Sequence, residues 1–241
     1  MAILVLVHGG WGGSWCWRDA ARMLRAAGHE VYAPTLTGLA ERAHVGPEGV
    51  TLSTHVAEIA GLLAFEELSD AILIGHSYGG MVITGAADRE PGRVAGMVYF
   101  DAFLPANGQS LWDLAPPETI AWQQADANHH DGGLSVPLPR SPRTPAGPGV
   151  RGYAPYTPLP IGTLQARWTS TRENPTWPCR HYILCTAYKH SPLYAIAARL
   201  RDDPDWTVSE IDAFHDVIYA QPERTAAAIE AALTSLDLDT R

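Results

Sequence analysis

The sequence is poor in cysteine, and it has no long apolar run. Its three cysteines, Cys16, Cys179 and Cys185, have the spacing of neither a CxxC motif nor a zinc finger, so a disulfide framework and a structural zinc site are not expected. No stretch approaches the roughly 20 apolar residues that a membrane helix needs. The apolar start at residues 2–7 is too short for the hydrophobic part of a signal peptide. We therefore expect a cytoplasmic protein that does not bind membranes.

Basic residues are also scarce. Lys and Arg number 17 against 26 Asp and Glu, which gives a formal net charge of −9 at pH 7. Proteins that bind nucleic acids rely on basic groups to neutralise phosphates, so nucleic acid is not an expected partner. Hydrophobic residues make up 46% and charged residues 18%, which is typical of a folded globule. With 241 residues, one large domain can bury a sufficient core without a disulfide or metal.

Segments typical of strands and helices alternate along the two ends of the chain. Apolar runs predict strands at residues 3–7, 30–33, 70–74, 94–100, 181–185 and 206–211. Apolar spacing and capping signals predict helices at residues 15–27, 52–68, 81–89, 193–201 and 223–236. This order indicates an α/β fold, with a mostly parallel sheet of about six strands and helices on both faces.

The alternation stops between residues 105 and 178, where Pro and Gly are dense, above all at residues 136–149. Each proline removes a backbone donor and fixes φ, so long runs of regular structure are not expected there. The segment nevertheless contains Trp112, Trp122 and Trp168, which a solvated linker would not need. We interpret it as a cap over a site, with these tryptophans as candidates for substrate binding; a flexible loop with stray aromatics is the alternative. The core would then comprise residues 1–104 and 179–241.

A candidate nucleophile lies between the strand at residues 70–74 and the helix that begins at residue 81. The segment Gly75-His-Ser77-Tyr-Gly79 matches G-x-S-x-G, in which a tight strand-to-helix turn projects the serine above the sheet edge and needs small flanking residues. The following helix directs N–H groups towards Ser77 and favours negative charge there. We interpret the adjacent His76 as a packing residue, because neighbouring side chains on such a turn diverge.

A serine nucleophile needs a base, and His215, in the loop before the last helix, is our candidate. A carboxylate must then orient the imidazole. No Asp or Glu occurs in residues 174–201, where the acid usually lies, so Asp101 at the end of the preceding strand becomes the candidate. The alternatives are Asp202 or no acid at all. A metal site at His129-His130-Asp131 is not favoured, because the wider spacing of a zinc motif is missing.

The tetrahedral intermediate of acyl transfer also needs donors for its oxyanion, each worth about 3–4 kcal/mol. The backbone N–H of Tyr78 is one candidate, since it follows the nucleophile. The other should come from the glycine-rich loop after the first strand, with Gly10 as first choice and Trp11 as second.

Several motifs together resemble the α/β-hydrolase superfamily, and within it the branch of plant methylesterases, hydroxynitrile lyases and bacterial EstC-type esterases. They are His8-Gly-Gly-Trp11, Trp15-Cys-Trp17, Leu36-Thr-Gly38, Glu41-Arg42, Gly75-His-Ser-Tyr-Gly-Gly-Met81 and Tyr182-Ile-Leu-Cys-Thr186. The resemblance implies a serine hydrolase that needs no cofactor and no metal.

Two departures from the branch guide the interpretation. The plant enzymes carry their acid shortly after the strand that residues 181–185 resemble, where this chain has Ala187-Tyr-Lys189, so Asp101 remains a hypothesis. The lyases use a threonine and a lysine where this chain has Gly9 and Asp216. Without an ammonium group to stabilise a departing cyanide, hydrolysis is favoured.

The sequence therefore predicts an esterase that acts on a carboxylic ester or lactone of a small to medium hydrophobic molecule. The expected partner is this small-molecule substrate, and a homodimer is left open. One alternative is a lyase or secondary-metabolite tailoring enzyme on the same fold. Another is a ligand receptor without catalysis, since fold alone does not fix function.

Overall fold

A single parallel sheet forms the centre of the computed structural model, which describes residues 1–138, 156–173 and 175–236. Its strand order is β2-β1-β3-β4-β7-β8, and every neighbouring pair is parallel. The strands are β1 (Ile3–Val7), β2 (Glu30–Tyr32), β3 (Ala71–Ser77), β4 (Val94–Ala102), β7 (Cys179–Cys185) and β8 (Trp206–Ile211). The predicted α/β fold with a six-stranded parallel sheet is confirmed.

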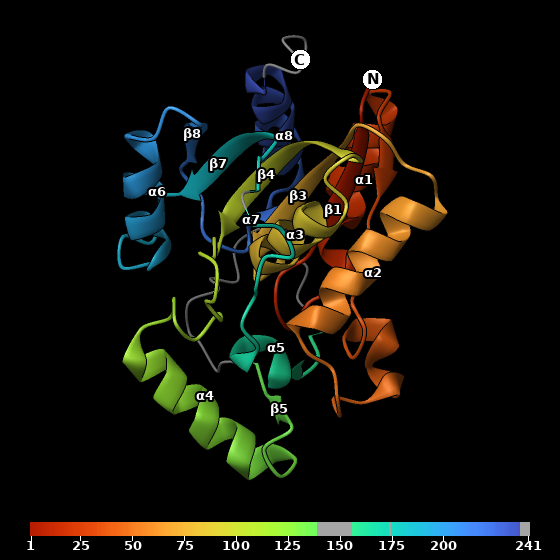
Figure 1. Cartoon of the computed structure of the whole chain (residues 1–241). Helices are drawn as coiled ribbons and strands as arrows, with labels where there is room; N and C mark the ends of the chain where they lie inside the picture. Colours follow the sequence, from red (N-terminus) through yellow and green to blue (C-terminus); the bar gives the residue numbers. More distant parts are fainter. Residues whose placement is uncertain (139–155, 174, 237–241) are drawn as a thin grey trace.

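Helices cover both faces of this sheet (Figure 1). One face carries α1 (Arg18–Ala26), α7 (Val217–Ala220) and α8 (Pro222–Ser235), and the other carries α2 (Leu52–Phe65), α3 (Gly79–Arg89) and α6 (Leu193–Arg201). Two 3₁₀ turns, η1 (Ser14–Trp17) and η2 (Ala40–Val45), complete the amino-terminal half. Within the described ranges, no helix has both the length and the apolar character needed to cross a membrane.

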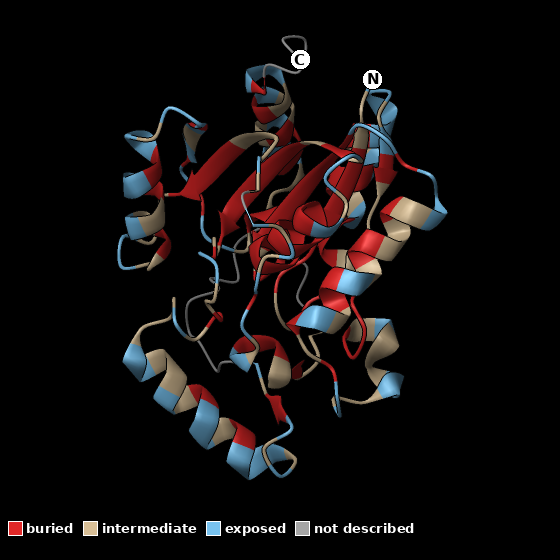
Figure 2. Ribbon diagram, in the orientation of Figure 1, coloured by how far each residue is buried: buried red, intermediate tan, exposed pale blue. Residues whose placement is uncertain are grey.

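The core is double-sided because successive side chains of a strand point to opposite faces. Leu73 and Tyr99 pack in the layer under α2, α3 and α6. Their neighbours Ile74 and Phe100 pack in the layer under α1 and α8. The central strands are therefore apolar without alternation, as expected for a sheet covered on both sides, and they are almost entirely buried (Figure 2).

The insertion between β4 and β7 builds a small layer beyond one end of the sheet (Figure 1). It contains α4 (Pro117–His130), the antiparallel pair β5 (Ser135–Val136) and β6 (Leu159–Pro160), and α5 (Gly162–Gln165). The 14-residue α4 contradicts our expectation that this segment lacks long regular structure. Its proline lies at the first helical position, where no N–H is required, and residues 118–130 contain neither Pro nor Gly. Most of the Pro-rich segment at residues 136–149 lies outside the described residues, because residues 139–155 are not described.

Candidate active site

Ser77 lies on a tight turn between β3 and α3. It adopts a left-handed backbone conformation with φ 54°, and α3 begins two residues later at Gly79. A Cβ atom at Gly75 would lie 2.6 Å from the carbonyl oxygen of Gly79, and one at Gly80 would lie 2.1 Å from the carbonyl oxygen of Phe103. No side chain fits at those distances, so the glycines allow the sharp turn that presents the serine at the end of the sheet.

His215 and Asp101 meet although they are 114 residues apart. His215 follows β8, and its Nδ1 lies 2.6 Å from Oδ2 of Asp101, the penultimate residue of β4. The other carboxylate oxygen, Oδ1, accepts a hydrogen bond of 3.0 Å from the backbone N–H of Cys185. Asp101 is only 2% exposed, whereas the side chain of His215 is 47% exposed. Asp202, our alternative acid, lies exposed at the end of α6.

This arrangement fixes the tautomer of His215. A carboxylate can only accept a hydrogen bond, so Nδ1–H of His215 donates to Asp101. In the neutral ring, Nε2 is then the nitrogen with a free lone pair, as a general base requires.

His76 also contacts His215, which our sequence analysis missed. Its Nε2 lies 2.7 Å from the carbonyl oxygen of His215, and the two ring centroids are 4.5 Å apart. Burial, together with the nearby His215, holds the pKa of His76 well below 6.5. The neutral His76 therefore donates from Nε2–H and holds the backbone of the His215 loop. We expected the side chains of neighbouring residues on the turn to diverge, and no sequence pattern indicates that His76 contacts the distant His215.

The glycine-rich loop after β1 passes directly against Ser77. A Cβ atom at Gly9 would lie 2.9 Å from Cβ of Ser77, and one at Gly10 would lie 3.0 Å from a methyl group of Leu159 in β6. The loop that carries the candidate oxyanion residues Gly10 and Trp11 therefore passes beside the serine at Gly9 and under the insertion at Gly10.

The buried His8 orders this loop. Its Nδ1–H donates to the carbonyl of Gly9 (2.7 Å), and its Nε2 accepts from the backbone N–H of Leu36 (3.1 Å). Burial lowers the pKa of His8 to about 4, which keeps the ring neutral.

Trp11 joins the same loop to the insertion. Its backbone is left-handed, with φ 62°. Its carbonyl accepts from the N–H of Thr157 (3.0 Å), and its indole N–H donates to the carbonyl of Val136 (2.8 Å). Two long-range hydrogen bonds therefore fix the position of the insertion over the loop.

The side chain of Tyr78 is anchored by a chain of polar groups that leads from the buried His55 to the partly exposed Glu58 and Arg42. Its hydroxyl donates to Nδ1 of His55 (2.8 Å), and Nε2–H of His55 donates to the carbonyl of Thr37 (2.8 Å). Glu58 accepts from the N–H of Thr37 (3.0 Å) and pairs with Arg42 (2.7 Å). Burial raises the pKa of Tyr78 well above 10, so the phenol remains a donor. This chain holds the residue whose N–H is the candidate oxyanion donor.

The three candidate tryptophans of the insertion have different surroundings. Trp112 donates from its indole N–H to Gln123 (2.7 Å), and Trp122 packs half-buried against the core. Trp168 is buried, and its ring centroid lies 6.0 Å from that of Trp177. It lines a cavity that neither Ser77 nor His215 lines.

The segment His129-His130-Asp131 has a structural role in the insertion. Asp131 accepts hydrogen bonds from the N–H groups of Leu134 and Ser135 and caps the turn after α4. In the part of the chain that the structure describes, no group of three or more His, Cys, Asp or Glu is arranged to hold a metal ion.

A parallel sheet with a serine on a glycine-rich turn, beside a His–Asp pair and a second glycine-rich loop, defines an α/β hydrolase. The sequence agrees, because the family described as "Alpha/beta hydrolase family" matches residues 4–231. The chain belongs to this family, and the predicted superfamily is confirmed.

Individual relatives are similar over nearly the whole chain. The carbendazim hydrolyzing esterase of Nocardioides sp. (strain SG-4G) is 38% identical over 242 residues, which cover 96% of this chain and 99% of the relative. Methylesterase 3 of Arabidopsis thaliana is 24% identical over 263 residues, which cover 94% of each chain. Among solved structures, an extracellular α/β-hydrolase from a Paenibacillus species aligns with a TM-score of 0.79 at 24% identity, over 96% of this chain and 99% of that one. The last similarity concerns the fold alone.

Proposed function

We propose that the protein is a serine esterase that cleaves carboxylic esters of small to medium hydrophobic molecules through an acyl-enzyme on Ser77. The observation that carries the proposal is the 2.6 Å contact between His215 and Asp101 at the end of the sheet where Ser77 lies on its turn. The relatives named above, an esterase and a methylesterase, support ester cleavage as the reaction.

In the first half-reaction, Oγ of Ser77 attacks the ester carbonyl while Nε2 of His215 takes its proton. Asp101 stabilises the resulting imidazolium through the hydrogen bond on Nδ1. The tetrahedral intermediate then collapses, the bond to the alcohol oxygen breaks, and His215 returns the proton to the leaving alcohol. In the second half-reaction, His215 takes a proton from a water that attacks the acyl-enzyme. The bond to Oγ of Ser77 then breaks, His215 returns the proton to Oγ, and the acid is released.

The backbone N–H groups of Tyr78 and Gly10 stabilise the negatively charged oxygen of both tetrahedral intermediates by hydrogen bonds. Trp11 is the alternative to Gly10. Support comes from the close approach of the loop after β1 to Ser77 and from the anchoring of Tyr78 on His55. Each such donor contributes about 3–4 kcal/mol to the stabilisation of the transition state.

The proposal of a hydrophobic substrate is supported by the insertion, because apolar groups of the insertion lie over the loop after β1. Leu159 covers Gly10, and Trp112 and Trp122 pack in the same hydrophobic layer. Apolar and aromatic walls gain affinity by burying apolar area of the substrate. The carboxylate of Asp216, which accepts from Tyr219 (3.1 Å), follows His215 in sequence and provides no cation for lyase chemistry.

The test is the hydrolysis of p-nitrophenyl butyrate by the wild type and by Ser77→Ala. We expect kcat/KM to fall by at least about 10⁴-fold in the variant, because loss of a serine nucleophile removes the acyl-enzyme route. Ser53→Ala is the matched control, since Ser53 is an exposed residue of α2. Activity that survives in Ser77→Ala would overturn the proposal.

A further inference from the structure

A cavity of about 490 Å³ lies on the sheet face that carries α3 and α6. It borders the segment that leads from α5 to β7, which runs beside α3 (Figure 1). The last part of the connection from β4 to β7, after α5, contains no helix in its described residues 166–173 and 175–178. The cavity occupies the space left beside this irregular segment, and its volume is in the range of small-molecule sites, about 300–1,000 Å³.

Two aromatic pairs contribute to the lining. The segment before β7 contributes Trp168 and Trp177, with ring centroids 6.0 Å apart. The sheet contributes Tyr99 and Trp206, with ring centroids 5.3 Å apart. Such surfaces favour a flat apolar body that can stack on rings.

Each aromatic pair carries an arginine. The guanidinium of Arg172 lies 5.3 Å from the ring centroid of Trp177, and that of Arg180 lies 4.6 Å from the ring centroid of Trp206. Both arginines line the cavity. A guanidinium stacked on a ring keeps its edge available for hydrogen bonds to a carboxylate.

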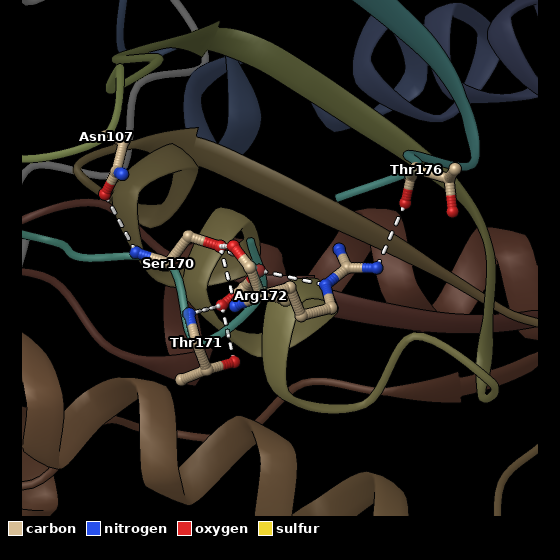
Figure 3. Close-up of polar contacts among 6 residues, drawn as sticks. Asn107, Ser170, Thr171, Arg172 and Thr176 are labelled. Atoms are coloured by element: carbon tan, nitrogen blue, oxygen red, sulfur yellow. Dashed lines mark hydrogen bonds and ion pairs between the residues drawn. The ribbon is translucent and has the colours of Figure 1, made fainter. Parts of the chain in front are cut away.

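The wall that holds Arg172 is fixed by a buried carboxylate. Asp88 of α3, 1% exposed, accepts hydrogen bonds from Ser170 Oγ (2.8 Å), from the N–H and hydroxyl of Thr171 (2.6 and 2.8 Å) and from Nε of Arg172 (3.1 Å). Nη1 of Arg172 donates to the carbonyl of Thr176 (3.2 Å; Figure 3). This side of the cavity is therefore built before any ligand arrives, which lowers the entropy cost of binding.

The arginines retain unused donors. Nη2 of Arg172 and Nε of Arg180 are buried and have no hydrogen-bond partner among the described residues. Their other donors are partly engaged, since Nη2 of Arg180 donates to Asp205 (3.2 Å), as Nε of Arg172 does to Asp88. Arg199 of α6 adds a third cation to the lining, whereas Glu173 and Asp203 add two negative charges. The acidic pair disfavours a highly charged ligand such as a phosphate, and the unused donors favour a single acceptor group.

We propose that this cavity is a second binding site, separate from the one at Ser77, for a planar aromatic carboxylate. The ring system lies between the two aromatic pairs, and the carboxylate binds the guanidinium groups of Arg172 and Arg180. Recognition needs both parts, because the rings give the apolar contact and the arginines fix the orientation.

Titration with 2-naphthoate, followed by calorimetry, measures the binding directly and involves no hydrolysis. We expect a Kd of about 1 mM or tighter for a ligand of this size. The neutral 2-naphthamide, of the same shape, should bind at least about tenfold more weakly. Arg180→Gln should weaken 2-naphthoate binding by about tenfold. Arg201→Gln, on α6 but outside the lining, should change it by less than about twofold.

The position of the probe is measured on protein labelled with ¹⁵N-tryptophan, whose eight indole N–H signals are assigned with Trp→Phe variants. We expect 2-naphthoate to shift the signals of Trp177 and Trp206 and to leave that of Trp11 in place. Shifts at Trp11 without shifts at Trp177 and Trp206 would place the probe beside Ser77 and overturn the proposal. Equal affinity for the acid and the amide, or no binding, would also overturn it.

Discussion

Acidification is expected to destabilise the fold through His8, and the size of the effect follows from its surroundings. The ring is completely buried, donates from Nδ1 to Gly9, and accepts at Nε2 from the N–H of Leu36. Protonation of Nε2 would place two donors against each other in a dry environment, which agrees with a pKa of about 4.

The unfolded chain takes up this proton more readily, because an exposed histidine has a pKa of about 6.5. The stabilisation is therefore fully present above about pH 6.5 and is lost as the pH falls towards 4. For these two pKa values, His8 alone lowers the free energy of unfolding by about 2 kcal/mol between pH 7 and pH 5. The limit at lower pH is about 3.4 kcal/mol. His55 and His76, whose pKa values are also lowered by burial, add to the slope of the wild type.

Urea denaturation at several pH values between 7 and 5 measures this slope. His8→Asn removes the titrating group, so the stability difference between wild type and variant should shrink by about 2 kcal/mol over that range. His44→Asn, an exposed site in η2, controls for the loss of a surface histidine. A difference between wild type and His8→Asn that stays constant from pH 7 to pH 5 would refute the assignment of a neutral, buried His8.

Three further predictions concern the turn, the candidate acid and the crossover. In urea denaturation, Gly80→Ala should lower the free energy of unfolding by at least about 3 kcal/mol, because its Cβ would lie 2.1 Å from a backbone oxygen. The control Gly61→Ala, in an open part of α2, should raise the free energy of unfolding by up to about 1 kcal/mol. Asp101→Asn should lower kcat for p-nitrophenyl butyrate by about 10⁴-fold with unchanged thermal stability, since an amide favours the wrong tautomer of His215; a loss below tenfold would remove Asp101 from the mechanism. Asp88→Asn should destabilise the protein by about 2–3 kcal/mol in urea, because its buried hydrogen bonds lose their charged acceptor; an unchanged midpoint would contradict this.

The sequence was informative wherever structure depends on local pattern. The bounds of α6 and β8 agree with the predicted ones, because apolar spacing and flanking polar residues define both. The turn at Ser77 was recognised from its glycines, whose need for space is local. Asp101 could be named as the candidate acid because residues 174–201 contain no Asp or Glu. In the structure, its carboxylate contacts His215.

Other features could not be predicted because they depend on contacts between distant segments. His76 contacts His215, 139 residues away, and the partners of Asp88 lie 82 to 84 residues away. In sequence, Asp88 is one polar residue near the end of a helix. The helix α4 was missed for a different reason, because the prolines of the whole segment were weighed together although Pro117 starts a helix.

The two ends of the insertion are fastened independently of what lies between them. The N–H of Phe103 donates to the carbonyl of Ser77 (3.0 Å) where the chain leaves the sheet, and Asp88 holds Thr171 and Arg172 where it returns. Because both ends of the insertion are held by these hydrogen bonds, the residues between them can be exchanged. A longer or shorter segment between Phe103 and Thr171 can therefore alter which substrates enter the site at Ser77, while β4 and β7 keep their positions.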